Sequence, residues 1–296
     1  MLYLFTSIIF TALLYIIFKA FARYGVDPLP AIVFNYTARV ILGLIIDPEG
    51  LTTYVQKAPP LLLALCIGTG ILFIAVFSLV SKGTRTLGVT ATTIVSRMSM
   101  VIPAAFSIIY YKESLGWMKF TGILLAMIAI YFTVYEKKIK VLTNHGATKK
   151  SKKALWLPIF LFLGGGFADT LLRMAQIEYM PLKLDYVYID ILYSVSAITG
   201  IIALIVTRTS FKTIFKKQNI IWGFILGADN YVALLLFLLA LTKGKLQGSQ
   251  VFPINSVGIV LFSTVFAIIF YHEKMQTNKI IGLCLAISAI LLISLS

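Results

Sequence analysis

Acidic residues, cysteines and histidines are scarce in this chain of 296 residues. It contains 11 Asp and Glu, 2 Cys and 2 His. Cys66 and Cys284 both lie inside apolar runs, so neither a disulfide framework nor a metal site is indicated. His145 lies in a hydrophilic segment and His272 in a turn, and no GxSxG, HExxH or phosphate-binding glycine motif is present. We therefore expect no enzymatic activity, no metal and no cofactor.

Charged residues of both signs make up only 12% of the chain, against 59% hydrophobic residues and a mean hydropathy of +0.95. Apolar runs of about 20 residues recur along the whole length, and each can cross a hydrocarbon core about 30 Å thick. The net charge of +15 is scattered through short linkers without a continuous basic face, which argues against nucleic-acid binding. The composition indicates an integral membrane protein whose basic loops face anionic headgroups.

Ten apolar windows predict an all-α membrane fold with ten transmembrane helices. The windows cover residues 2–22, 29–46, 60–81, 87–110, 117–135, 155–175, 186–207, 219–241, 247–271 and 277–295. Five lie on each side of a hydrophilic segment. We therefore divide the chain into a first five-helix repeat at 1–138, a basic linker at 139–153 that acts as a solvated tether, and a second five-helix repeat at 154–296.

The second half of the chain repeats the first. At a constant offset of 160, YYKESLGWMKFTGILLAMIAI at 110–130 aligns with FYHEKMQTNKIIGLCLAISAI at 270–290, and Gly88 aligns with Gly248. Because each repeat has an odd number of spans, the second enters the membrane from the opposite face, which predicts an inverted-topology repeat. Such repeats are typical of secondary transporters that open a midplane cavity to each side in turn.

Lysines and arginines are distributed unevenly between the two sides of the predicted bundle. Of the 26, seventeen lie on the side of the central linker and six on the opposite side. The positive-inside rule therefore places the linker in the cytoplasm and both termini outside, in a plasma or inner membrane.

Three arginines and three acids fall inside, or near the ends of, predicted spans. They are Arg39, Arg97, Arg173, Asp169, Asp190 and Asp229. An ionised side chain near the bilayer centre costs about 2.5 to 3.5 kcal/mol even on a lenient scale, so such groups face a cavity or a partner. These residues are the first candidates for a site.

Arg97 lies about halfway along the fourth span beside Ser96, and its repeat mate is Val257, so no symmetric role requires it. Its guanidinium could bind a carboxylate or phosphate through two parallel hydrogen bonds, or it could pair with an aspartate of a neighbouring span. Arg39 is similar and has Asn35 one helical turn before it. Both alternatives stay open for both arginines.

Asp229 and Asn230 lie in the middle of the eighth span, with no cation one turn away. Because burial disfavours the ionised form of a carboxyl, Asp229 is the first candidate for proton coupling or for binding a substrate amine. The alternative is pairing with Arg39 or Arg97 across the cavity.

Asp169 and Arg173 are spaced i, i+4, so mutual neutralisation is favoured over a coupling role. The three glycines at 164–166 indicate close helix packing or a locally loosened helix, and packing is the commoner reason. Asn255 in the ninth span and Tyr231 in the eighth could add hydrogen bonds to a substrate.

Small residues form a matching stripe on the fifth and tenth spans. The stripe consists of Gly122, Ala126 and Ala129 and their repeat mates Gly282, Ala286 and Ala289. It predicts close packing, either inside the protomer or at a homodimer contact. Glu113 and Glu273 precede these spans, where an acid favours a helix N-terminus, so we expect a structural role for both.

Residues 103–122 and 263–282 share one pattern: a helix containing proline or small residues, a short turn with Glu, and a helix that opens near Gly. With the ten spans in two repeats, this pattern resembles the drug/metabolite transporter superfamily, EamA-type. The sequence departs from that pattern in two ways. Ser263 stands where the first half has Pro103, with Pro253 earlier in the helix, and many relatives have cytoplasmic termini.

The resemblance implies a carrier or exporter of small molecules, with a central cavity lined by the first four spans and their repeat mates. Three intramembrane arginines against three acids favour a zwitterionic or anionic metabolite, such as an amino acid. It would be moved by alternating access, with proton coupling or exchange. A flippase for a lipid or lipid-linked precursor is the main alternative function, and a membrane-embedded enzyme is a further one.

Overall fold

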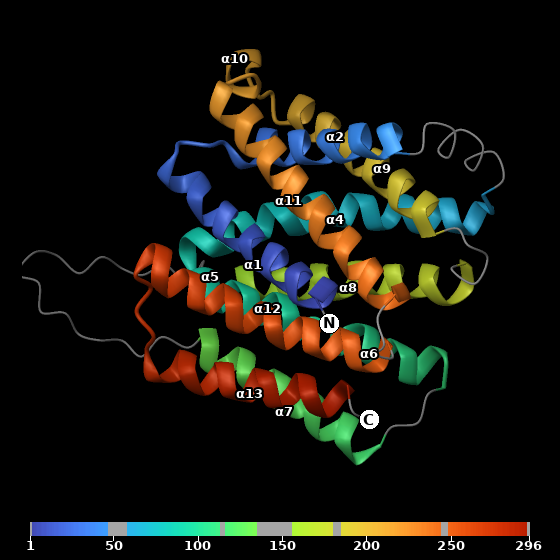
Figure 1. Ribbon diagram of the computed structural model, residues 1–296, viewed down its shortest axis with the longest axis vertical. Coiled ribbons are helices and arrows are strands. Elements are labelled where there is room, and N and C mark those ends of the chain that lie inside the picture. Colours follow the sequence, from blue (N-terminus) through green and yellow to red (C-terminus); the bar gives the residue numbers. More distant parts are fainter. Residues whose placement is uncertain are drawn as a thin grey trace, which may run out of the picture.

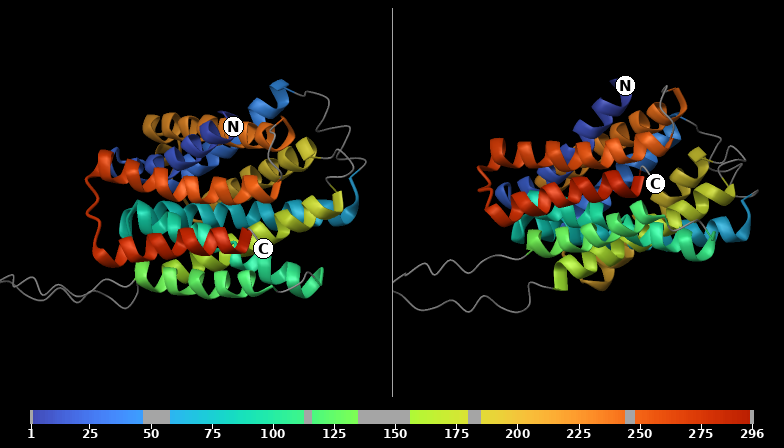
Figure 2. Two further views of the ribbon diagram at one scale, coloured as in Figure 1. Left: turned by 60° about the horizontal axis from the view of Figure 1, so that its bottom comes forward. Right: turned by 90° about the horizontal axis from the view of Figure 1, so that it is seen from below.

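The computed structural model describes residues 2–46, 58–112, 116–134, 156–179, 185–243 and 248–294. This part of the chain is helical and contains no strand. The long helices run roughly alongside one another, as Figures 1 and 2 show. The helices are α1 (Leu2–Arg23), α2 (Pro28–Ile46), α4 (Pro60–Thr86), α5 (Val89–Met98), α6 (Val101–Tyr110), α7 (Trp117–Val134), α8 (Trp156–Tyr179), α9 (Asp185–Val206), α10 (Phe211–Ile214), α11 (Lys217–Lys243), α12 (Gly248–Tyr271) and α13 (Thr277–Ser294).

Six stretches in the described residues are long and apolar enough to cross a membrane. These are Leu2–Arg23, Pro28–Ile45, Pro60–Thr86, Val89–Tyr110, Lys217–Phe237 and Ile254–Tyr271. Shorter apolar stretches are Phe120–Thr133, Trp156–Leu172, Ile191–Val206 and Thr277–Leu292. Nine of the predicted windows each coincide with one apolar helix in the described residues, and the all-α, multi-pass character of the protein is confirmed.

The fourth predicted window is not one helix but two, α5 and α6. Pro103 has no backbone N–H to donate to the carbonyl of Ser99, and the amide of Ile102 donates to that carbonyl instead, at 3.0 Å. The second half has Ser263 in place of Pro103, and α12 is a single helix that runs through Pro253. The repeat is therefore broken at this point in the first half alone.

The short helix α10, which the hydropathy windows did not predict, is followed by two polar residues, Lys216 and, at the start of α11, Asn219, that contact the turn between α1 and α2. The amide of Asp27 donates to Oδ1 of Asn219 at 2.8 Å, and the Asp27 carboxylate pairs with Nζ of Lys216 at 2.9 Å. Partial burial tends to raise the pKa of Asp27, but hydrogen bonds from Lys216 and Asn219 and the charges of Lys216 and Arg85 outweigh it. The pKa of Asp27 is consequently lowered.

The predicted small-residue stripe packs α7 against α13 within the protomer. Ala126, Ala129, Ala286 and Ala289 are all fully buried. A Cβ at Gly282 would collide with Thr133 and with the carbonyl of Ala129. This contact accounts for the stripe without a second copy of the chain.

The two halves interlock so that packing partners recur at the repeat offset. α1 packs on α11 as α8 packs on α4, and α2 packs on α11 as α9 packs on α4. α1 also packs on α12, as α8 does on α5 and α6. Lys112 and His272, which are 160 residues apart, both take left-handed backbone angles, with φ of 52° and 48°, where α6 and α12 end.

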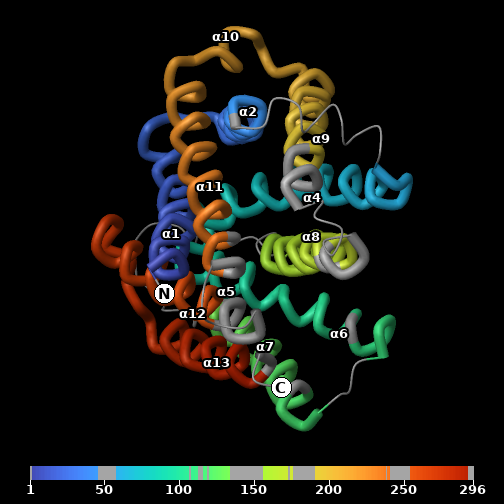
Figure 3. Tube along the Cα trace, turned by 45° about the vertical axis from the view of Figure 1, so that its right-hand side comes forward, coloured from blue at the N-terminus to red at the C-terminus, as the bar shows by residue number. Residues whose placement is uncertain are grey.

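Helices from both halves of the chain lie together in the middle of the molecule. Helices α2, α9 and α10 lie at one end, and α7 and α13 at the other, with α1, α4, α5 and α8 between them (Figure 3). The main buried cluster is centred on α1 and includes Phe18, Phe21, Tyr36 and Leu226.

Candidate functional site

An arginine and an aspartate are buried where α2, α9 and α11 meet. Arg39 on α2 is 2% exposed, and its Nη2 donates at 3.0 Å to the backbone carbonyl of Asn230 on α11. Its guanidinium carbon lies 3.7 Å from the ring centroid of Tyr193 on α9, a close cation–π contact. Arg39 is also the cation whose charge acts on Asp229, which is 8% exposed. Of the two partners considered for Asp229, the structure provides Arg39.

Glycines on α11 allow α2 to approach closely enough for this contact. A Cβ at Gly227 would lie 2.8 Å from the carbonyl of Asn35, and a Cβ at Gly223 would lie 2.7 Å from the carbonyl of Ala31. Any larger residue would push the two backbones apart. The glycines therefore set Asn35 and Arg39 of α2 beside the polar part of α11.

Several buried polar atoms of this group have no hydrogen-bond partner in the described residues. They are Oδ1 and Nδ2 of Asn35, the hydroxyl of Tyr36, Nε of Arg39, Oδ2 of Asp229 and Nδ2 of Asn230. Leaving a buried polar group unsatisfied costs about 1 to 3 kcal/mol. A cluster of such groups is unusual for a region that serves packing alone, so it has hydrogen-bonding capacity for a polar ligand.

A second arginine and aspartate lie together at the break between α5 and α6. Oγ of Ser99, in the break, is 3.2 Å from Oδ2 of Asp169 on α8 and 2.6 Å from the carbonyl of Ser96. The charge of Arg97 acts on Asp169. Asp169 is exposed, while Arg97 and Ser96 are partly buried. The guanidinium and the carboxylate come from different halves of the chain and are accessible together.

Part of this second group also has unused hydrogen-bonding atoms. Nε of Arg97 and Oγ of Ser96 have no partner among the residues that the structure describes. Because the α5 helix ends immediately after Arg97, the local backbone departs from regular helical geometry at the point where these polar groups gather.

The glycine run at 164–166 packs α8 against this break. A Cβ at Gly165 would lie 3.1 Å from Oγ of Ser99, and one at Gly166 would collide with Ile102. Helix α8 continues through the run without interruption. Of the two predicted explanations, close packing is confirmed and a loosened helix is not found.

The remaining candidate residues are less completely placed. Asn255 on α12 is partly buried and its Oδ1 has no partner within the described chain, while Tyr231 follows Asn230 on α11 and is partly buried. Their contact with a substrate stays a prediction. The side chains of Arg173 and Asp190 lie outside the described part, so the proposed pairing of Asp169 with Arg173 is untested.

Glu273 caps a helix other than the one expected. Its Oε2 accepts a hydrogen bond of 2.9 Å from the amide of Val89, the first residue of α5, and its Oε1 pairs with Nζ of Lys279 at 3.1 Å. Gly88 precedes α5 with φ of 91°, and a Cβ there would lie 2.5 Å from a Glu273 oxygen. Glu273 thus has structural contacts with the start of α5 and with Lys279 of the helix that follows it, as a structural role predicts, and the contact with α5 arises because the turn folds back on the first half. Glu113 lies outside the described residues.

Sequence reasoning missed two features of these groups. It considered Tyr193 as a possible stacking residue but did not pair its ring with Arg39, since an intramembrane tyrosine carries no distinguishing local signal. It also missed the contact between Glu273 and α5, for which a signal existed: Gly88 and Glu273 both belong to the repeat. No group of three His, Cys, Asp or Glu side chains that could hold a metal occurs in the described ranges.

Comparison with known proteins finds a family for the first half of the chain. Residues 1–135 match the EamA-like transporter family, which is part of the drug/metabolite transporter superfamily. The resemblance predicted from residues 103–122 and 263–282 is thereby confirmed. A transporter family also agrees with the expectation that the protein is not an enzyme.

Two further comparisons cover most of the chain. An uncharacterized protein of Haemophilus influenzae is 23% identical over 269 residues, which are 88% of this chain and 86% of the relative. A protein of known crystal structure aligns with 97% of this chain and 95% of its own, with a TM-score of 0.57 and 14% identity. At that identity the likeness concerns the fold alone. The chain is thus a multi-pass membrane protein whose first half matches a family of transporters of the drug/metabolite type.

Proposed function

We propose that this protein is a secondary transporter that moves a small zwitterionic or anionic metabolite, with an amino acid as the favoured class, by alternating access. The observation that carries the proposal is the accessible pair of Arg97 and Asp169 at the α5–α6 break. A guanidinium beside a carboxylate complements the carboxylate and ammonium of an amino acid. Ser96 and Asn255 are additional hydrogen-bonding groups on α5 and α12, which pack together.

The proposed architecture is two five-helix repeats of inverted topology, with ten helices crossing the membrane. Its support is the sequence repeat together with the recurring packing pairs and the matched left-handed residues Lys112 and His272. Inverted repeats allow two conformations that are mirror-related across the membrane. Alternating access between them requires the contact of Glu273 with the start of α5 to open, since it joins the two halves at the end nearest the linker.

The buried group around Arg39 and Asp229 is proposed as the coupling element. Its residues are shielded from solvent in this conformation, and Oδ2 of Asp229 has no hydrogen-bond partner within the described structure. The carboxyl group of Asp229, on which the charge of Arg39 acts, is proposed to bind a proton or a substrate amine when the helices move. Asn35, Asn230 and Tyr231 are proposed to contribute polar contacts to this group.

The charge distribution supports a cell-membrane location with the linker on the cytoplasmic side. A small-molecule substrate and the lipid bilayer are the proposed partners. A homodimer is not needed to explain the small-residue stripe, because α7 and α13 use it within the protomer.

The test is thermal unfolding of the purified protein with amino acids, sugar phosphates, nucleotide sugars, cationic drugs and lipids, repeated for Arg97→Ala and Asp169→Asn. We expect one carboxylate- or phosphate-bearing class to raise Tm of the wild type, with a loss of about tenfold or more in affinity for Arg97→Ala, equivalent to about 1.4 kcal/mol. Asp169→Asn should weaken binding of zwitterions more than of simple anions.

The matched control is Arg208→Ala, which removes an exposed arginine at the end of α9, away from both groups. It should bind ligands as the wild type does. Stabilisation by cations or lipids alone, or an unchanged ligand response in Arg97→Ala, would show that the anion-binding role is wrong. Lipid-only stabilisation together with lipid translocation in proteoliposomes would instead establish a flippase.

A further inference from the structure

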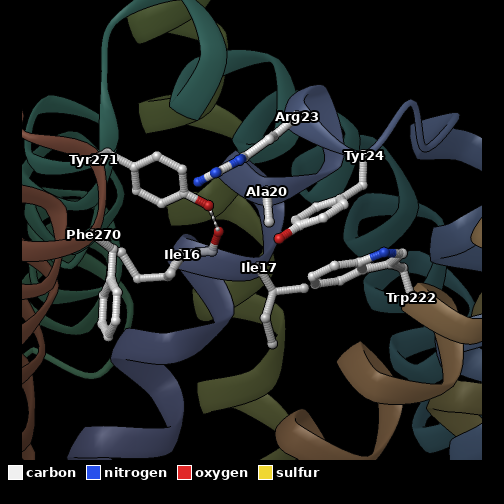
Figure 4. A pocket seen from close by; sticks show the side chains of 8 residues that line it. All are labelled: Ile16, Ile17, Ala20, Arg23, Tyr24, Trp222, Phe270 and Tyr271. Atoms are coloured by element: carbon white, nitrogen blue, oxygen red, sulfur yellow. Dashed lines mark hydrogen bonds between the residues drawn. The ribbon is translucent and has the colours of Figure 1, made fainter.

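A cavity of about 270 Å³ opens between α11 and α12, over one face of α1 (Figure 4). Its floor is apolar and consists of Ile16, Ile17 and Ala20 of α1. Trp222 of α11 and Phe270 of α12 form opposite walls. The cavity exists because α1 packs closely on both α11 and α12, while those two helices barely touch each other.

Polar and aromatic groups lie where α1 ends, on the side of the molecule that carries the linker. The guanidinium carbon of Arg23 is 6.0 Å from the ring centroid of Tyr24, and the Tyr24 ring is tilted against Trp222 at 4.9 Å. The hydroxyl of Tyr271 donates to the carbonyl of Ile16 at 3.2 Å. Figure 4 shows the Arg23 guanidinium close to the Tyr271 phenol. The cavity is thus cationic and aromatic at one end and apolar at the other.

Exposed apolar side chains lie on both helices that form the walls of the cavity. Ile221 and Ile225 on α11 and Val265 and Ile269 on α12 are all more than 40% exposed. In a chain that spans the membrane, such residues face lipid. The cavity therefore opens sideways into the bilayer, near the level at which Trp, Tyr and Arg side chains meet headgroups.

The aromatic lining is not required by the repeat. Helices α4 (Pro60–Thr86) and α11 (Lys217–Lys243) correspond at an offset of 157 residues, which matches Trp222 with Leu65. The wall that the second half contributes therefore has a ring that its counterpart in the first half lacks. A ligand present in one leaflet only explains why one copy alone has this ring.

We propose that this cavity binds an anionic phospholipid from the leaflet on the side of the linker. The phosphate group lies against Arg23, with Tyr24, Tyr271 and Trp222 at the level of the glycerol, and one acyl chain follows Ile17 and Phe270. The distribution of basic residues supports an anionic lipid. Seventeen of the 26 lie on this side, which by the positive-inside rule faces the more anionic leaflet.

Native mass spectrometry of the full-length protein with phosphatidylglycerol and, separately, phosphatidylcholine tests the proposal. The variants are Arg23→Gln and Trp222→Leu, the latter placing the residue of its repeat mate in the cavity. Arg208→Gln, an exposed arginine on the same side but outside the cavity, is the control. We expect phosphatidylglycerol to bind the wild type preferentially. Arg23→Gln should lower its affinity about fivefold, as one basic residue near an anionic surface supplies about 1 kcal/mol.

Trp222→Leu should weaken both lipids, and Arg208→Gln should resemble the wild type. An equal loss of phosphatidylglycerol affinity in Arg23→Gln and Arg208→Gln would overturn the proposal, since any basic residue on this side would then attract the lipid equally. Competition by glycerol phosphate as effective as by the whole lipid would also overturn it in favour of a soluble anion. The outcome is independent of the transport proposal, because Arg97→Ala should leave phosphatidylglycerol binding unchanged.

Discussion

Arg39 makes three kinds of contact that depend on the shape of a guanidinium. One nitrogen donates to a backbone carbonyl, the planar group lies over the Tyr193 ring, and the charge acts on Asp229. An ammonium group of lysine could not maintain all three in the same geometry. The residue therefore connects α2, α9 and α11, and its charge acts on an intramembrane acid.

Arg39→Ala should lower the free energy of unfolding by about 3 kcal/mol, because it removes the buried hydrogen bond to the carbonyl of Asn230, the contact with the Tyr193 ring and the charge that acts on Asp229. Asp229→Asn should restore part of this loss when combined with Arg39→Ala, since the uncompensated charge is then removed. Thermal or denaturant unfolding in detergent of both single variants and the double variant measures the coupling. Losses that simply add would show that the two residues do not act as a pair.

Asp27 supplies a prediction for the pH dependence of stability. The pKa of Asp27 is lowered in the folded protein. Its ionised carboxylate therefore contributes to the free energy of unfolding above about pH 4, and this contribution is lost as the pH falls through the lower pKa of the folded state. The expected loss is below about 1 kcal/mol because the Asp27 and Lys216 side chains are 38% and 45% exposed. Unfolding between pH 3 and pH 6 should show a smaller acid-induced decline for Asp27→Asn than for the wild type, and identical curves would contradict the assignment.

At the scale of elements, the chain uses proline and small residues to decide where helices break and where they touch. Pro103 ends the regular hydrogen bonding beside Arg97, whereas Ser263 leaves α12 continuous. Gly165 and Gly166 allow α8 to pack closely against this break. Ala129 and Ala289 allow α7 and α13 to pack closely against each other. Helix contacts inside a membrane rely on such close packing, since lipid already surrounds apolar side chains.

Ala129→Leu should destabilise the protein by about 1 to 3 kcal/mol, because the fully buried contact between α7 and α13 has no room for three more carbons. Thr121→Leu, at an exposed position on the same helix, is the matched control and should change stability little. Unfolding temperatures in one detergent compare the two. Similar values for both variants would indicate that the stripe is not a tight contact.

At the scale of the whole molecule, the proposed inverted repeat makes orientation a measurable property. Lys112 follows α6 and Lys212 lies in α10, and both are exposed on opposite predicted sides. In a Cys284→Ala background, a membrane-impermeant maleimide applied to intact cells should label Lys112→Cys and spare Lys212→Cys. Permeabilised cells should label both and thus control for reactivity. The reverse pattern would place both termini and the linker on the opposite sides from those predicted by the charge count.

The sequence was sufficient for the membrane class, the positions of the apolar helices and the resemblance to a transporter family. Hydropathy is a local property summed over about 20 residues, so each apolar window was found within a few residues of its helix. The windows could not show α10, which is short and polar, or the break beside Pro103, where the surrounding residues are as apolar as in a continuous span.

Partnerships were decided by the tertiary structure. The sequence alone determined which charged residues lie within apolar spans, because composition needs no knowledge of helix rotation. It could not determine that Arg39 acts on Asp229, that Arg97 acts on Asp169, or that Glu273 caps α5. In spans that are apolar all round, periodicity does not define which face meets which neighbour. Only the packing of both halves against each other brings these distant residues together.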